Sequence, residues 1–66
     1  MCSYEVLWYE GNTEEEALCG DAHWVNFSTR KKALNYYEQH KNDAGCFAWW
    51  VTKRDADGEI VEDLVY

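Results

Sequence analysis

The amino-acid sequence predicts an α+β fold in which a four-stranded, mainly antiparallel sheet carries one main helix on one face, in the order ββαββ. Three observations favour this fold. Four segments are rich in aromatic and β-branched residues, one longer segment has apolar residues at helical spacing, and glycine-containing turns separate them. Because a chain of 66 residues can bury only a modest core, residues 1–66 are expected to form a single domain.

The four strand segments differ in how their apolar residues are arranged. Residues 4–9 and 22–27 alternate large side chains between two faces, as half-buried strands do. Residues 46–54 are apolar on both faces at their centre, which predicts a strand in the middle of the sheet. A hairpin loop at 55–58, with the sequence Asp-Ala-Asp-Gly, leads to a last strand at 59–66.

The main helix is expected from Thr29 to Asn42, a stretch without glycine or proline in which Ser28 or Thr29 can act as the N-cap. One side of this helix carries Ala33, Leu34, Tyr37 and His40 or Lys41. The first turn holds three cations, Arg30, Lys31 and Lys32, although the helix dipole disfavours positive charge there. Nothing in the sequence accounts for this cluster.

Residues 10–21 form an acidic connection between the first two strands. Thr13 followed by Glu14, Glu15 and Glu16 is a capping-box pattern, which favours a short helix ending near Gly20. The alternative is a solvated acidic loop, because short helices are marginal on their own. The sequence leaves both open.

One cluster between the helix and the sheet is expected to form the core. Its members are Val6 or Leu7, Val25 or Phe27, Leu34, Tyr37, Trp49 or Trp50, and Ile60 or Val61. The choices between neighbours stay open because a shift of one residue exchanges the two faces of a strand.

The charge balance limits the classes of partner. Thirteen acidic and six basic side chains give a net charge of −7, which repels phosphate backbones and anionic membranes. We therefore expect no membrane association and regard nucleic-acid binding as disfavoured. An odd number of cysteines, without a CxxC pair or a secretory signal pattern, favours a cytoplasmic location.

Four side chains are potential zinc ligands: Cys2, Cys19, His23 and Cys46. Only Cys19 and His23 are closely spaced, whereas structural zinc sites show close ligand pairs. We expect no metal and no cofactor, with Cys46 as a small buried hydrophobic residue and the other two cysteines as ordinary thiols.

No motif indicates catalysis. Cys19 and His23 lack both an orienting third group and a glycine-rich oxyanion loop, so the chain is not expected to be an enzyme. The segment from Asp55 to Glu59 is similar to part of a calcium loop. Placing Gly58 at its sixth position puts Lys53 at the first and Leu64 at the twelfth, and neither can coordinate calcium. The segment is therefore interpreted as a turn.

Large apolar groups are expected on both faces of the sheet. Tyr4, Val6 and Trp8 alternate with Leu7 and Tyr9, and Phe47, Trp49 and Val51 alternate with Ala48 and Trp50. Since one helix covers only one face, the other face needs a cover, which is either the acidic connection or a partner protein. The expected interaction surface comprises Tyr4, Trp8, Trp24, Trp49 and Trp50.

These observations favour a protein–protein interaction module that associates with itself, as a homodimer, through the aromatic sheet face or an edge strand. The alternative function is an acidic decoy that occupies a nucleic-acid-binding site on another protein. Its carboxylates, in place of phosphates, would be Glu14, Glu15, Glu16, Asp55, Asp57, Glu59, Glu62 and Asp63. A solvated surface is the commoner meaning of such charges.

The layout resembles that of small bacterial and phage proteins whose function is uncharacterised. The residues that carry the resemblance are Tyr4-Glu-Val6, Phe27-Ser28-Thr29, Ala33-Leu34 and Asp57-Gly58. The resemblance covers most of the chain and concerns the order of elements alone. It implies the ββαββ fold and a bacterial or phage origin, and it transfers no functional residues.

Overall fold

A computed structural model describes residues 2–65 of the chain. Its elements, in order, are β1 (Ser3–Glu10), α1 (Glu14–Leu18), β2 (Ala22–Phe27), α2 (Arg30–His40), β3 (Cys46–Arg54) and β4 (Ile60–Val65). All four strands form one antiparallel sheet, so the predicted α+β fold is confirmed. The last strand was expected over 59–66, and Tyr66 lies outside the described residues.

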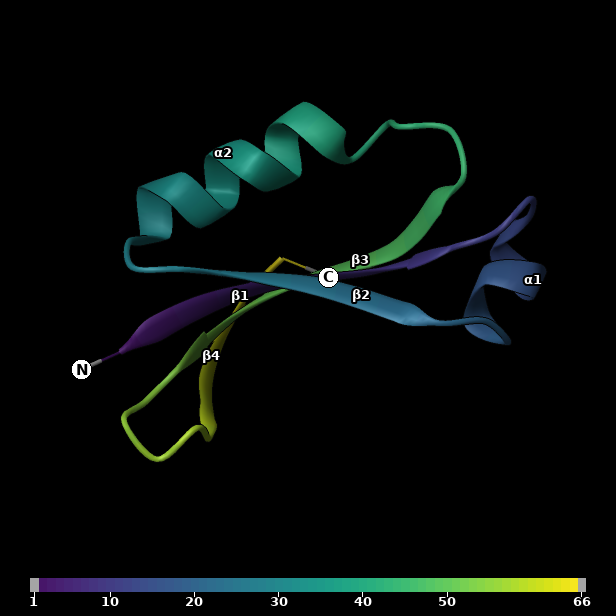
Figure 1. Ribbon diagram of the computed structural model, residues 1–66. Helices are drawn as coiled ribbons and strands as arrows, with labels where there is room; N and C mark the ends of the chain where they lie inside the picture. Colours follow the sequence, from purple (N-terminus) through teal and green to yellow (C-terminus); the bar gives the residue numbers. More distant parts are fainter. Residues whose placement is uncertain (1, 66) are drawn as a thin grey trace.

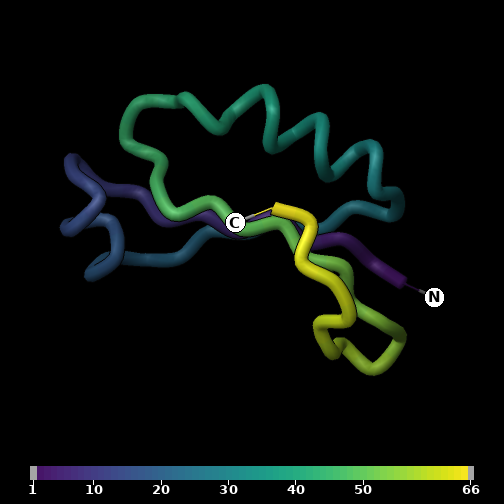
Figure 2. Tube along the Cα trace, turned by 180° about the vertical axis from the view of Figure 1, so that it is seen from behind, coloured from purple at the N-terminus to yellow at the C-terminus, as the bar shows by residue number. Residues whose placement is uncertain are grey.

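The strand order in the sheet is β2-β1-β3-β4. β1 and β3 are therefore central, as predicted for the strand at 46–54, and β2 and β4 are the two edges. Helix α2 runs along one face of the sheet, and α1 lies at one end of it, away from α2 (Figure 1). The view from behind shows the same arrangement, with the β3–β4 hairpin at the opposite end from α1 (Figure 2).

Helix α2 begins at the predicted cap. The Thr29 hydroxyl accepts a 3.3 Å hydrogen bond from the Lys32 amide, so Thr29 rather than Ser28 is the N-cap. The helix ends at His40, two residues earlier than predicted. There the His40 imidazole lies 2.7 Å from the Asp43 carboxylate, and the Asp43 amide donates to the His40 carbonyl, which fixes a turn in place of further helix.

The core lies between α2 and the sheet. Val6, Ala33 and Val51 are fully buried there. Around them pack half-buried side chains from both layers: Tyr4, Trp8, Val25, Phe27, Leu34, Tyr36, Tyr37, Trp49, Leu64 and Val65. Of the alternative core residues that the sequence left open, the structure buries Val6 rather than Leu7 and packs Trp49 rather than Trp50 against the core.

The predicted contribution of Ile60 or Val61 to this core is wrong. Their side chains are 42% and 54% exposed, and Leu64 and Val65 pack against the core instead. The reason is the register of β4, which shifts twice against β3. In addition, the start of β4 follows a hairpin that points away from α2 (Figure 1).

A bulge in β3 interrupts the alternation of side chains between the two sheet faces that the sequence predicts for this strand. Trp50 pairs with Leu7 and Phe47 pairs with Tyr9, so Trp8 faces two residues, and one of these, Ala48, has a φ of 56°. Because directly paired residues share a face, Phe47 lies on the face of Trp50. The sequence pattern had assigned it to the face of Trp49.

The acidic connection contains the short helix α1. The Thr13 hydroxyl accepts a 3.2 Å hydrogen bond from the Glu16 amide, as the capping-box pattern predicts. Ala17 is fully buried where α1 packs against β1 and β3. Of the two alternatives for residues 10–21, the helix is therefore the observed one.

Candidate interaction surface

Three apolar side chains form a row across the sheet on the face opposite α2. Leu7 of β1 pairs directly with Trp24 of β2 and with Trp50 of β3, so the three share one face. This face points away from α2 because the adjacent residue Val6 packs against Ala33 of that helix. Trp24 is 60% exposed and Trp50 is 39% exposed. We call Leu7, Trp24 and Trp50 the aromatic row.

The expected interaction surface is thereby divided between two faces. Trp8 and Trp49 stack on each other with ring centroids 5.1 Å apart and pack, like Tyr4, against the core under α2. These three therefore lie, partly buried, on the face that α2 covers, apart from Trp24 and Trp50. The physical reason is strand geometry, because neighbouring residues such as Trp49 and Trp50 point to opposite faces.

Trp49 occupies the core at a cost. Its Nε1 atom is buried, and it has no hydrogen-bond partner among residues 2–65. An unsatisfied buried donor costs about 1–3 kcal/mol, so its ring packing against Trp8 and Tyr37 has to outweigh that cost.

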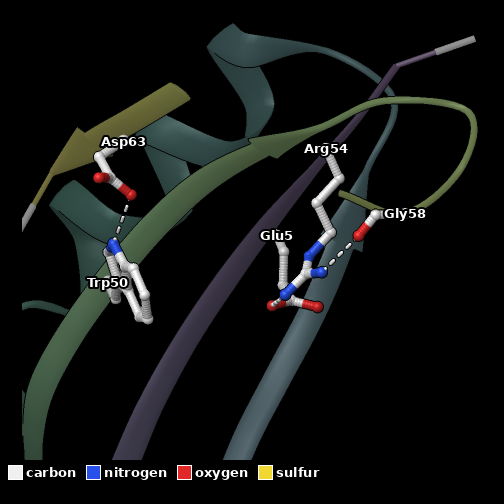
Figure 3. Close-up of polar contacts among 5 residues, drawn as sticks. All are labelled: Glu5, Trp50, Arg54, Gly58 and Asp63. Atoms are coloured by element: carbon white, nitrogen blue, oxygen red, sulfur yellow. Dashed lines mark hydrogen bonds and ion pairs between the residues drawn. The ribbon is translucent and has the colours of Figure 1, made fainter. Parts of the chain in front are cut away.

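The Trp50 side chain is held in place at the surface. Its Nε1 donates a 2.9 Å hydrogen bond to Oδ1 of Asp63 on the neighbouring strand β4 (Figure 3). A tryptophan fixed in this way loses little conformational entropy when another protein packs on it. Trp24, by contrast, lies on the edge strand β2 and is more exposed than Trp50.

Polar groups adjoin the aromatic row on the same face. Glu5 and Arg54 form an ion pair at 3.2 Å, and Arg54 Nη1 donates to the Gly58 carbonyl at 2.7 Å (Figure 3). Thr52, which pairs with both Glu5 and Asp63, is buried between them. An apolar patch beside such polar groups is the usual composition of a protein interface.

The candidate acidic surface is not brought together. Glu14, Glu15 and Glu16 lie on α1, whereas the other five acids lie on the β3–β4 hairpin and on β4, at the opposite end of the sheet (Figure 2). Asp55 also stabilises its own turn, because its Oδ1 accepts hydrogen bonds from the amides of Asp57 and Glu59.

The candidate metal ligands are likewise dispersed. Within residues 2–65, no three His, Cys, Asp or Glu side chains are grouped so that they could hold a metal ion. Cys2 and Cys19 are exposed, and His23 stacks on Trp8 with its Nε2 3.8 Å from the Glu10 carboxylate. The absence of zinc stays a prediction that metal analysis of the purified protein tests.

Cys46 differs from the other two thiols in its surroundings. It is half-buried at the start of β3. Burial raises the pKa of its thiol above the usual 9.0, and the carboxylates of Glu10 and Asp43 raise that pKa further. A raised pKa lowers the fraction of reactive thiolate, which is the opposite of what a nucleophilic cysteine requires.

Two further properties of the described part of the chain bear on function. No pocket for a small molecule opens over residues 2–65, and neither helix there has the length and apolar character needed to cross a bilayer. In the comparisons with known proteins, no family model, curated protein or solved structure matches this chain. Function is therefore inferred from the surface itself.

Proposed function

We propose that this chain is a small protein–protein interaction module that associates with a second copy of itself through a contact that includes Trp24, at the edge-strand end of the aromatic row. The observation that carries the proposal is the exposure of Trp24 and Trp50 on either side of Leu7. Two tryptophans on one sheet face are costly to leave in water, and tryptophan is among the residues most enriched at binding hot spots. No catalytic step is part of the proposal.

The positions of the two helices on the sheet support the proposed self-association. Helix α2 covers one face of the sheet, and α1 packs against β1 and β3 at one end. Neither helix removes Trp24 from solvent, and the chain described here has no further element to do so within residues 2–65. A second copy presents the same apolar surface, and such isologous contacts are the commonest kind in soluble oligomers.

The test is the solution mass of the protein over the micromolar range, measured by sedimentation equilibrium. The wild type should approach the mass of a dimer as concentration rises, and Trp24→Ser should stay monomeric with an unchanged far-UV circular dichroism spectrum. Val61→Ser is the control because Val61 is 54% exposed on β4, the edge strand opposite β2. A wild type that remains monomeric throughout would overturn self-association.

A further inference from the structure

The two edges of the sheet are not equally protected against pairing. β4 shifts register twice against β3 and carries Glu62 and Asp63, which are features that natural edge strands use to prevent association. β2 pairs with β1 in continuous register from Ala22 to Phe27 and contains no Lys, Arg, Asp, Glu or Pro. Its outer backbone groups therefore form an unprotected edge that is ready to accept another strand.

The two ends of β2 carry opposite charges. Before the strand lie the exposed carboxylates of α1, Glu14, Glu15 and Glu16, followed by Asp21. After it lie the exposed cations in the first turn of α2, Arg30, Lys31 and Lys32. Figure 1 shows α1 beside the start of β2 and the first turn of α2 beside its end. The acidic and basic clusters are thus separated by the length of this one strand.

We infer that two copies of the chain pair through β2, antiparallel about a two-fold axis, so that their sheets join into one. This inference rests on the proposed self-association and specifies its geometry. Antiparallel pairing places the start of each β2 beside the end of the other, which brings α1 of one copy to the basic turn of its partner. The two-fold axis makes this contact twice.

The charge arrangement accounts for the cations that the helix dipole disfavours. Arg30, Lys31 and Lys32 follow an N-cap where acidic residues would stabilise the helix. In the dimer they lie at the same end as the carboxylates of the partner's α1, and such complementarity fixes the orientation of association and raises its rate. Parallel pairing would instead place like charges together.

The symmetry also restricts the register. A two-fold axis perpendicular to the sheet keeps each face on its own side, so opposing residues of the two β2 strands belong to the same face. Keeping most of residues 22–27 paired then puts the axis beside Trp24 or beside Val25. In the first case the two Trp24 side chains face each other directly, and in the second they are diagonal neighbours about 7–8 Å apart. Either register brings the two Trp24 side chains together, while Leu7 and Trp50 stay on the open face of the joined sheet.

Amide hydrogen exchange of the wild type tests the pairing directly. In a monomer, the alternate β2 amides that point away from β1 exchange rapidly. In the β2-paired dimer these amides of residues 22–27 should become protected as concentration rises, while those of β4 should not change. A dimer by mass with no added protection in β2 would overturn the edge geometry and leave the proposed self-association intact.

Charge reversal tests the orientation. One variant carries Arg30→Glu, Lys31→Glu and Lys32→Glu, and a second carries Glu14→Lys, Glu15→Lys and Glu16→Lys. Each alone should dimerise about tenfold more weakly or worse, because both of its contacts bring like charges together. An equimolar mixture should recover the wild-type mass through heterodimers.

The mixture separates this proposal from an effect on folding. Both variants have a net negative charge and so have no general attraction for each other, and their circular dichroism spectra show whether each is folded. Recovery on mixing supports antiparallel β2 pairing. Two folded variants that both dimerise like the wild type, or that fail to associate when mixed, would overturn it. A wild type that is monomeric throughout would defeat the proposed function itself.

Discussion

Trp50 and Asp63 are joined across β3 and β4 by a 2.9 Å hydrogen bond from the indole Nε1 to the carboxylate Oδ1. The bond satisfies the one polar group of an otherwise apolar side chain, and it does so with an acid of the neighbouring strand. One end of the aromatic row is therefore orientated before any partner arrives. Rigid aromatic anchors of this kind reduce the entropy lost on binding.

Replacing Asp63 by Ala should release the Trp50 ring. The indole N–H would lose its acceptor and exchange with water faster, and its side-chain order parameter would fall, while global stability drops by only about 1 kcal/mol. Heteronuclear NMR of the indole group measures both quantities. Asp63→Asn is the control, because the amide oxygen can still accept the bond; an indole signal that is unchanged in Asp63→Ala would show that packing alone orients Trp50.

Gly11→Ala should destabilise the junction between β1 and α1. A Cβ atom at Gly11 would lie 2.6 Å from the backbone nitrogen of Ala17 and 2.8 Å from its Cα, so the short helix has to move. Overpacking of this kind costs about 1–3 kcal/mol. In Gly20→Ala the new atom would meet nothing closer than 3.4 Å, and this variant should unfold in urea much closer to the wild type. Equal losses in both variants would contradict the close packing of α1.

Leu34→Ala should lower the free energy of unfolding by about 2 kcal/mol, near the lower end for such truncations because the side chain is half-buried. Ile60→Ala should change it by no more than about 0.5 kcal/mol, since Ile60 is exposed and outside the core. Urea denaturation of both variants makes the comparison. The reverse ranking would mean that α2 packs elsewhere and that β4 contributes its first residues to the core.

The elements were predictable from the sequence because local signals specify them. The stretch after Thr29 has helical spacing and a cap, and the structure uses that cap. The segment from Cys46 to Val51 is apolar on both faces, and the structure places it in a central strand. Even α1, left open as helix or loop, begins at the predicted Thr13 cap.

The faces were less predictable because they depend on register. The bulge opposite Trp8 moves Phe47 to the face of Trp50, and nothing in the local sequence marks Ala48 as the residue with a φ of 56°. The same holds for β4, where two shifts replace Ile60 and Val61 by Leu64 and Val65 in the core. Register is set by pairing between distant segments, so only the fold determines which of the five expected surface residues are exposed.

The Cys46 thiol should titrate above its usual pKa of 9.0 in the folded protein, because burial and two nearby carboxylates favour its neutral form. The fold therefore favours the neutral form of the Cys46 thiol. This contribution to the free energy of unfolding is fully present at pH values below the pKa of Cys46 in the unfolded chain, and it is lost as the pH rises through the higher pKa of the folded state. In a Cys2→Ser, Cys19→Ser background, iodoacetamide should modify Cys46 more slowly in the native state than in urea at the same alkaline pH. Faster modification in the native state would indicate an activated thiol instead.

Arg54→Ala should be among the most destabilising changes on the face opposite α2. Arg54 pairs with Glu5 at 3.2 Å where the two side chains are only 32% and 16% exposed, and it also donates to the Gly58 carbonyl at the end of the hairpin loop. Truncation leaves the Glu5 carboxylate without its partner, at a cost of about 1–3 kcal/mol.

Urea denaturation of the single and double variants measures the coupling energy between Glu5 and Arg54. Glu5→Gln combined with Arg54→Ala should lose less stability than the two single changes added together, because the second change removes the charge that the first left unpaired. Strict additivity would show that Arg54 acts through the hairpin loop alone.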